Sequence, residues 1–297
     1  YSANFLREDA DFTAELGNQL LMGTPVEILQ DSSYWRKVTS PDPYTAWCVD
    51  MSLAEMTGEQ LRQYISAPKL ICTAKYSAIY EEPSLKSPVV GDFVMGDIVI
   101  DKKKARGRFR RVATASGTEG YVLKKDVSDF RKWAASRNPS AENIIAVAKD
   151  FLGVPYMWGG TSIKGVDCSG LTRMVWFMNG VLLPRNASEQ AFVGTEIPVD
   201  ASASLPERVA DLLPGDMIFF GTKGYGDERD SISHVGIYLG DGKFIHASRV
   251  VRISSLLPDA PDFYDLSHKF IRAVRIAGDG NDTGTVIITD SPAYFND

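Results

Sequence analysis

Residues 166–171 read VDCSGL and open the run LTRMVWFMN, which decides how the second half of the chain folds. Apolar residues recur in this run at the spacing of one helix face. They are Leu171, Val175 and Met178. Asp167 is a residue type that caps helices, and Gly165 and Gly170 let the backbone turn tightly. The stretch therefore predicts a helix with Cys168 in its first turn or at its cap.

Two roles are open for Cys168 at this position. A cysteine at a helix start is usually a small apolar residue of the core. In the other role it is a nucleophile, because the unpaired N–H groups and the positive end of a helix favour thiolate over thiol. The same N–H groups can stabilise a developing oxyanion. The choice between the two roles depends on whether a base lies nearby.

The base is expected to be a histidine if the protein acts near neutral pH. All three histidines follow Cys168; His234 opens the strand-like run SHVGIYLG, and His246 lies in KFIHAS. The turn LGDGK between the runs predicts a hairpin. The two histidines are twelve residues apart, so a regular register puts both on one face. We expect His234 to take the thiol proton and His246 to fix its tautomer. His268, in DLSHKF, is expected at the surface.

The composition is that of an ordinary globular protein. The chain has 297 residues, enough for two or three domains, with 44% apolar and 24% charged residues. A net charge of -6 argues against a nucleic-acid surface, which needs clustered Lys and Arg; the basic run at 102–111 is expected to be a solvated hairpin. No apolar run reaches the roughly 18 residues of a membrane span. Because the chain begins at Tyr1, we expect a processed amino terminus.

The cysteines predict neither a disulfide framework nor a metal site. Cys48 and Cys72 are expected to be buried and free, and a bond between them stays open as an alternative for an exported protein. No Cys/His cluster has the spacing of zinc ligands. We therefore expect no metal ion and no cofactor.

The first 130 residues contain a degenerate repeat. Trp35, Val38 and Trp47 match Phe109, Val112 and Tyr121 at an offset of 74. Each copy has a turn glycine and short alternating strands, which predicts a small β-barrel. The MG-x-x-V strand and the closing WC or GYV strand resemble bacterial SH3-like domains. We place the first domain at 1–68 and the second at 69–128, with a short helix at 53–65 between the barrels.

The pattern changes after Pro139, where SAENIIAVAKDFLG predicts a helix capped by Ser140 and closed by Gly153. Glycine-rich loop, helix and strands then follow, which predicts an α+β domain at 139–276. Residues 277–297 are expected to be a tail lying on one of the domains.

Besides VDCSGL, SHVGIYLG and KFIHAS, the third domain contains PYMWGG and PGDMIFF. These five segments together resemble the NlpC family of bacterial cell-wall cysteine peptidases. The resemblance covers residues 140–276 and implies a papain-like α+β core, with Cys168 as nucleophile, His234 as base and His246 as orienting residue. The SH3-like domains in front match the subgroup of γ-D-glutamyl-L-diamino acid endopeptidases, or dipeptidyl-peptidase VI. The segments are PYMWGG (155–160), DCSGL (167–171), PGDMIFF (214–220), SHVGIYLG (233–240) and FIHAS (244–248).

The resemblance also implies substrate-binding residues. Tyr156 matches a tyrosine near the oxyanion site, and Ser188 is a candidate for the D-Glu carboxylate. Asp167 and Ser169 are expected to hold the substrate backbone, Asp167 near a free amine, since an unpaired buried carboxylate needs a cation. The first SH3-like domain is expected to supply an acid and a tyrosine to that amine, and the matching residues are Glu15 and Tyr44.

The expected activity is hydrolysis of the γ-D-Glu to L-diamino acid bond in murein peptides with a free N-terminal L-Ala. An amidase or acyltransferase on the same core, or a non-catalytic peptidoglycan-binding protein, are the alternatives. The partners are peptidoglycan-derived peptides, with no nucleic acid and no membrane span, and the protein is expected to be a monomer. Export to the cell envelope is expected, with the cytoplasm as the alternative. The insertion at 189–213 is expected to line the cleft on a side that the sequence does not define.

Overall fold

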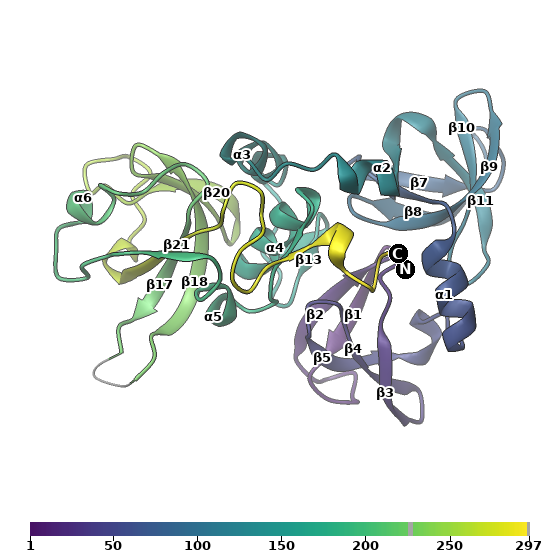
Figure 1. The fold of residues 1–297 in the computed structure, drawn as a ribbon, viewed down its shortest axis with the longest axis horizontal. Coiled ribbons are helices and arrows are strands. Elements are labelled where there is room, and N and C mark those ends of the chain that lie inside the picture. The colour runs from purple at the N-terminus through teal and green to yellow at the C-terminus, as the bar shows by residue number, and fades with distance from the viewer. Residues whose placement is uncertain (225–227, 296–297) are drawn as a thin grey trace. The chain divides into compact units, whose positions relative to one another are not determined.

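The computed structural model describes residues 1–224 and 228–295 (Figure 1). The chain forms two compact units, and neither is a continuous segment. Unit 1 comprises residues 1–137, 161–163 and 288–297. Unit 2 comprises residues 138–160 and 164–287.

Unit 1 begins with a five-stranded antiparallel sheet in the order β2-β1-β5-β4-β3. Its alternating side chains enclose a small core that includes Leu6, Val38 and the free thiol Cys48. The strands are β1 (Ala3–Arg7), β2 (Leu16–Leu21), β3 (Glu27–Ser32), β4 (Trp35–Thr39) and β5 (Thr45–Val49).

The second sheet of unit 1 has the order β12-β6-β9-β10-β11-β7-β8. Cys72 is free and packs in its core beside Phe93. The strands are β6 (Lys69–Cys72), β7 (Tyr76–Tyr80), β8 (Val89–Val94), β9 (Ile98–Arg106), β10 (Phe109–Ala113), β11 (Glu119–Leu123) and β12 (Val127–Asp129).

The strand pairing reproduces the repeat seen in the sequence. Trp35 lies opposite Val49 between β4 and β5, and Phe109 lies opposite Leu123 between β10 and β11. Each residue of the second pair lies 74 positions after its counterpart in the first pair, so the two hairpins have the same register. The two sheets are consistent with small SH3-like barrels. The basic run at 102–111 forms the exposed β9–β10 hairpin, as expected.

Two helices accompany the barrels, α1 (Gly58–Ser66) and α2 (Phe130–Ala135). The predicted helix at 53–65 is wrong at its start, because Thr57 and Gln60 form a capping box that begins the helix at Gly58. Residues before Thr57 therefore remain outside the helix.

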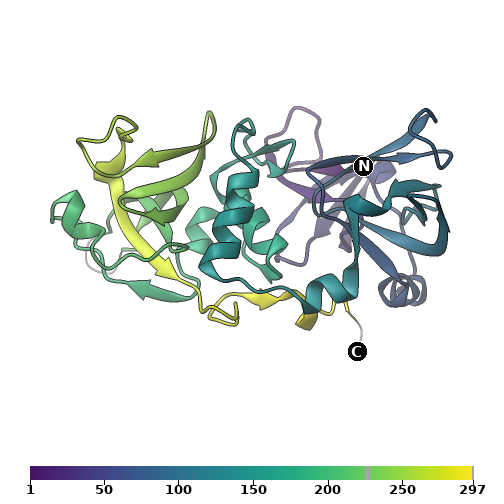
Figure 2. The same cartoon turned by 90° about the horizontal axis from the view of Figure 1, so that it is seen from above.

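Unit 2 combines helices with a six-stranded antiparallel sheet in the order β16-β21-β17-β18-β19-β20. Helices α3 and α4 pack against each other, and both contact β18 (Figure 2). The helices are α3 (Ala141–Asp150), α4 (Cys168–Met178), α5 (Ala187–Gln190) and α6 (Leu205–Arg208). The sheet strands are β16 (Thr195–Ile197), β17 (Met217–Thr222), β18 (Ser231–Gly240), β19 (Lys243–Ser248), β20 (Val250–Ser255) and β21 (Phe270–Arg275).

The insertion at 189–213 contributes β16 and α6 to unit 2. Strand β16 pairs with β21, so it forms the edge opposite the histidine-bearing hairpin. Three further short strands lie between α3 and α5: β13 (Thr161–Ser162) in unit 1, and β14 (Gly165–Val166) and β15 (Val181–Leu182) in unit 2.

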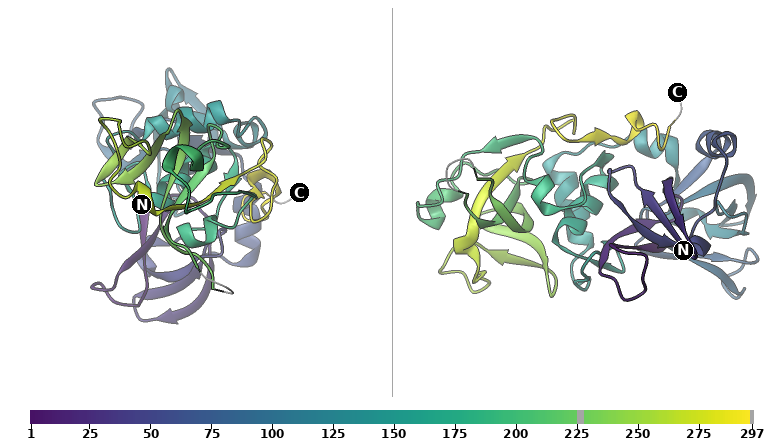
Figure 3. Two further views of the ribbon diagram at one scale, coloured as in Figure 1. Left: turned by 90° about the vertical axis from the view of Figure 1, so that its left-hand side faces the viewer. Right: turned by 90° about the horizontal axis from the view of Figure 1, so that it is seen from below.

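The segment after β21 is divided between the two units (Figure 3). In unit 2, β22 (Val286–Ile287) pairs with β15. In unit 1, the 3₁₀ turn Ile288–Asp290 lies against α2, and Phe295 stacks on Phe130 with ring centroids 5.1 Å apart. The predicted tail at 277–297 therefore packs as two separate segments.

Candidate active site

Cys168 is the first residue of α4, as the sequence predicted. The Asp167 side chain caps the helix by accepting a hydrogen bond of 2.7 Å from the backbone N–H of Gly170. A Cβ atom on Gly170 would lie 1.9 Å from the carbonyl oxygen of Gly160. The glycine in DCSGL thus allows the helix start to pack directly on the end of PYMWGG.

His234 and His246 lie on adjacent strands β18 and β19 of the predicted hairpin. His234 Nε2 and His246 Nδ1 are 2.8 Å apart, within hydrogen-bond distance. Because Ile237 pairs with Ile245, the residue opposite His246 is Gly236. A Cβ atom on Gly236 would lie 3.3 Å from His246 Cβ and 2.8 Å from the Phe244 ring, so this glycine leaves room for the buried imidazole.

The thiol of Cys168 lies next to the strand that carries His234. The backbone N–H of Val235, the residue after His234, faces the sulfur together with the N–H of Ser169. Both N–H groups favour the thiolate; that of Ser169 does so as expected for a helix start, whereas that of Val235 belongs to strand β18. The structure therefore brings thiol, histidine and amide donors together in unit 2.

Burial nevertheless has the largest effect on the pKa values of Cys168, His234 and His246. It raises the pKa of Cys168 to about 11, and Asp167 adds to the rise by repulsion. Burial also lowers the pKa of His234 to about 4 and that of His246 to about 2. The helix start lowers the thiol pKa as expected, but the net lowering that a nucleophile needs is absent, because the loss of water disfavours the thiolate more than the two N–H groups stabilise it.

Asp167 is not the unpaired carboxylate that the sequence suggested. It forms a buried ion pair with Arg185, whose Nη2 lies 2.5 Å from Oδ2. Arg185 Nη1 also donates to Ser169 Oγ at 2.8 Å, and the Gly159 N–H donates to Asp167 Oδ2 at 3.0 Å. Arg185 thus neutralises the carboxylate and fixes both residues that flank the nucleophile. The premise that a substrate cation must neutralise Asp167 is therefore corrected.

Tyr156 lies close enough to Cys168 and Asp167 for both to affect its phenol electrostatically. Burial, followed by repulsion from Asp167 and from the thiolate that Cys168 forms at high pH, raises the pKa of Tyr156 to about 12, so its hydroxyl stays a donor. Its backbone N–H donates to the Arg249 carbonyl oxygen at 2.9 Å, which holds it beside the end of β19. A hydrogen-bond donor next to the nucleophile suits stabilisation of an oxyanion.

Ser188 is exposed in α5, the short helix that packs against β18. Its neighbour Gln190 is buried and donates from Nε2 to the carbonyl oxygen of Ser169 at 3.1 Å. His268 is exposed, as expected.

Glu15 and Tyr44 belong to the first barrel of unit 1. The hydroxyl of Tyr44 donates a short hydrogen bond to Glu8, whereas the backbone of Glu15 accepts from the Glu8 N–H at 3.0 Å. A Cβ atom on Gly17 would lie 2.0 Å from both the Glu8 carboxylate and the Tyr44 hydroxyl. Gly17 therefore allows an acid–tyrosine pair in which the acid is Glu8, and the role of Glu15 stays a prediction.

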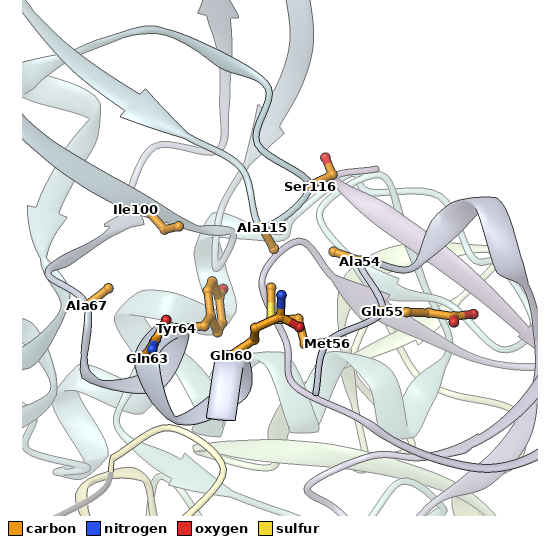
Figure 4. Close-up of a pocket in the computed structure, with 10 residues that line it drawn as sticks. All are labelled: Ala54, Glu55, Met56, Gln60, Gln63, Tyr64, Ala67, Ile100, Ala115 and Ser116. Carbon is orange, nitrogen blue, oxygen red and sulfur yellow. The ribbon is translucent and has the colours of Figure 1, made fainter. Parts of the chain in front are cut away.

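Unit 1 also contains a shallow pocket of about 550 Å³ between α1 and the second barrel (Figure 4). Tyr64 lies at its centre and donates to the Gly23 carbonyl oxygen at 3.0 Å. Glu55, the acidic residue of the lining, is paired with Arg36. Within the described residues, the lining contains no cysteine or histidine, so it offers neither of the groups that Cys168 and His234 provide.

Sequence reasoning missed Arg185, Gln190 and Glu8. The motif LPRNASEQ contains the first two, and an arginine before a helix cap was the available signal for a buried partner of Asp167. For Glu8 the signal was weaker, because only strand pairing shows which acid lies beside Tyr44.

The fold and the site together define a class of protein. Helices pack on an antiparallel sheet, a cysteine begins one of these helices, and two hydrogen-bonded histidines lie on adjacent strands. This is the arrangement of papain-like cysteine peptidases.

The comparisons with known proteins identify the family. The sequence profile of the NlpC/P60 family matches residues 153–264. Residues 153–264 therefore form an NlpC/P60 domain, the domain of a family of cysteine peptidases.

The relatives differ in how much of their length the chain covers. A γ-D-glutamyl-L-lysine dipeptidyl-peptidase of Bacillus cereus is 27% identical over 82% of this chain and 71% of that protein. One of Bacillus subtilis is 34% identical over 58% of this chain and 51% of that protein, about half its length. The crystal structure of an NlpC/P60 family protein from Bacillus cereus has a TM-score of 0.75 at 24% identity, covering 92% of this chain and 97% of that one. That structure shows the same fold.

Within the described residues, no helix has the length and apolar character needed to cross a membrane.

Proposed function

We propose that the protein hydrolyses the amide bond between γ-D-Glu and an L-diamino acid in murein peptides that carry a free N-terminal L-Ala. The observation that carries the proposal is that Cys168, at the start of α4, lies against the N–H of Val235, whose neighbour His234 is hydrogen-bonded to His246 across the β18–β19 hairpin. The names of the relatives, γ-D-glutamyl-L-lysine dipeptidyl-peptidases, support the choice of bond.

In the proposed reaction, Cys168 Sγ attacks the γ-carbonyl carbon of D-Glu while His234 takes the thiol proton. Negative charge moves to the carbonyl oxygen, where the Ser169 N–H and the Tyr156 hydroxyl are candidate donors. His234 then gives the proton to the leaving amine of the diamino acid, and a thioester to Cys168 remains. Water, deprotonated by His234, attacks the thioester, releases the D-Glu carboxylate and restores the thiol.

The requirement for a free amine is the finer part of the proposal. Asp167 and Ser169 would align the substrate backbone, and Ser188 would bind the D-Glu carboxylate. Because Arg185 already neutralises Asp167, the ammonium group needs a second acid, and the acid–tyrosine pair of the first barrel has the right chemistry. Glu8 is therefore a candidate for this second acid beside Glu15, with Tyr44 as its partner.

The substrates would be peptides released from peptidoglycan, and the place of action the cell envelope. A murein DD-endopeptidase of Escherichia coli, 36% identical over 113 residues, supports a cell-wall setting. The monomeric state stays a prediction.

The test is to incubate the protein with L-Ala-γ-D-Glu-L-Lys, with the diaminopimelate analogue, and with both peptides acetylated at the N-terminus. Release of L-Ala-D-Glu, measured by liquid chromatography and mass spectrometry, is expected only from the free peptides. The Cys168→Ala variant should release none.

Two results would contradict the proposal at different levels. Equal cleavage of free and acetylated peptides would refute the amine requirement and leave the peptidase activity in place. No release of L-Ala-D-Glu by the wild type would refute the choice of bond.

A further inference from the structure

The hydroxyl of Ser254 extends the series of hydrogen bonds that begins between His234 and His246. His246 Nε2 lies 3.0 Å from Ser254 Oγ on the neighbouring strand β20. His246 is 0% exposed and Ser254 is 3% exposed, so water has no access to this contact. His246 pairs with Arg252 in the β19–β20 register, which places Ser254 diagonally across the strand pair on the same face.

Three of the four ring nitrogens of His234 and His246 have a defined hydrogen-bond partner. His234 uses Nε2 for His246, so only its Nδ1 is left to accept the thiol proton of Cys168. A neutral imidazole that accepts at Nδ1 must hold its own proton on Nε2 and donate it to His246 Nδ1. His246 must then carry its proton on Nε2, where it needs an acceptor. Ser254 Oγ occupies that place.

We propose that Ser254 is a positioning residue that accepts a hydrogen bond from His246 and thereby keeps His234 in the tautomer able to take the thiol proton. The reversed line, with Ser254 donating to His246 Nε2, would put the His234 proton on Nδ1, where it blocks the base. Without a hydroxyl at position 254 the Nε2–H of His246 is left buried and unpaired, and the choice between tautomers is lost.

The groups around His246 keep its ring neutral, so what matters is which ring nitrogen carries the proton and not whether the ring is charged. Burial, with smaller contributions from His234 and Arg252, lowers the pKa of His246 to about 2, so the ring is neutral at physiological pH. Asp167 is the charged group that acts on His234. Tyr264 touches both rings, with its centroid 4.8 Å from that of His246.

The experiment compares Ser254→Thr with Ser254→Val, two side chains of the same shape that differ in the hydroxyl. Ser254→Thr should keep kcat, whereas Ser254→Val should lower kcat roughly tenfold with KM unchanged, because Ser254 does not touch the substrate. Equal kcat values for the two variants would overturn the proposal. Ser254→Ala replaces Ser254→Val if the larger side chain prevents folding, as judged by circular dichroism.

A second readout needs neither substrate nor substitution. Long-range ¹H–¹⁵N spectra of protein labelled at histidine show which ring nitrogens carry protons. Both His234 and His246 should be protonated on Nε2 in the wild type, and His234 should lose this preference in Ser254→Val. A proton on Nδ1 of His246 in the wild type would overturn the proposal.

The inference rests on the proposed role of His234 as base, and the two can fail separately. If murein peptides are not cleaved but both Nε2 positions are protonated, the tautomer assignment stands and the substrate proposal falls. If murein peptides are cleaved but His246 carries its proton on Nδ1, the substrate proposal stands and the tautomer assignment falls.

Discussion

Burial acts on Cys168 and His234 in the same direction, since it favours the neutral form of each. A thiol pKa of about 11 and a histidine pKa of about 4 mean that free protein near pH 7 holds a thiol beside a neutral imidazole. In the proposed reaction, the proton would therefore move to His234 during attack on the substrate rather than beforehand. This differs from a site that stores a thiolate–imidazolium pair.

Iodoacetamide alkylation tests this assignment. Only the thiolate is alkylated, so the rate at Cys168 should stay low at pH 6 and rise continuously from about pH 8 to above pH 10. Peptide mapping by mass spectrometry separates Cys168 from Cys48 and Cys72, and Cys168→Ala is the blank. A rate that reaches its plateau below pH 7 would show a stored ion pair.

The Asp167–Arg185 pair leads to a prediction about stability. Arg185→Met should lower the free energy of unfolding by about 3–5 kcal/mol, because Asp167 would remain buried without a cation. Arg185→Lys keeps the charge but loses the two-pronged contact, and should fall between wild type and Arg185→Met.

Urea denaturation followed by circular dichroism measures both variants, with Asp167→Asn/Arg185→Met as the control. The double variant leaves no buried charge and should recover part of the loss. If it is no more stable than Arg185→Met, charge burial is not the cause.

The sequence supported some residue assignments better than others, for physical reasons. The placement of Cys168 at a helix start and of His234 beside His246 followed from local periodicity, which the structure reproduces. Arg185 and Ser254 act through contacts across 18 and 8 residues that no local period encodes. The prediction of a lowered thiol pKa failed because the burial of Cys168, which raises this pKa, depends on the whole fold.

At the scale of elements, the start of α4 carries the strongest packing constraint. Alanine normally stabilises a helix relative to glycine, yet the added methyl of Gly170→Ala would collide with the Gly160 carbonyl oxygen at 1.9 Å. This substitution should destabilise the protein by about 1–3 kcal/mol and move Cys168 away from Val235.

Gly58→Ala in the first turn of α1 is the matched control. Its Cβ atom would meet nothing closer than Arg62 Nη1 at 3.7 Å, so stability should be unchanged or slightly higher. Thermal unfolding of both variants gives the comparison. If the two variants shift the midpoint of thermal unfolding equally, the contact with the Gly160 carbonyl oxygen does not explain the effect of Gly170→Ala on stability.

Elements with a strong local signal were predictable, whereas their exact ends and sheet neighbours were not. The β4–β5 and β10–β11 hairpins follow from alternation and the 74-residue offset. The start of α1 required the Thr57 capping box to outweigh the apolar residues before it. The edge position of β16 depends on pairing with β21, whose residues lie 76 to 80 positions after their partners, so the insertion itself contains no sign of it.

At the scale of the whole molecule, residues 288–295 complete the hydrophobic packing of unit 1. Phe295 is 8% exposed and stacks on Phe130, and Ile288 is 0% exposed. Phe295→Ala should lower the stability of unit 1 by about 3 kcal/mol, since it removes a buried ring. The fluorescence of Trp133, which also stacks on Phe130, reports the unfolding.

Tyr34→Ala is the control for this prediction. Tyr34 is 68% exposed, so its removal should change stability by less than about 0.5 kcal/mol. If Phe295→Ala also lowers the free energy of unfolding by less than about 0.5 kcal/mol, residues 288–295 contribute little to the stability of unit 1.

The division of the chain was the part least accessible from sequence. A boundary near 138 coincides with the change in pattern, but the sequence could not assign residues 161–163 to unit 1. Thr161 Oγ1 donates to Asn18 Oδ1 at 2.8 Å, and its N–H donates to Gln19 Oε1 at 2.9 Å. These contacts join positions more than 140 residues apart, and nothing in the intervening sequence specifies them.

The interleaving of the two units also has a consequence for biosynthesis. A ribosome adds residues 288–295 only after it has made all of residues 138–287. Until then Phe130 lacks the stacked ring of Phe295, so unit 1 emerges first and is completed last. The two barrels therefore pass through translation with an uncovered apolar site, and the arrival of the final segment closes it.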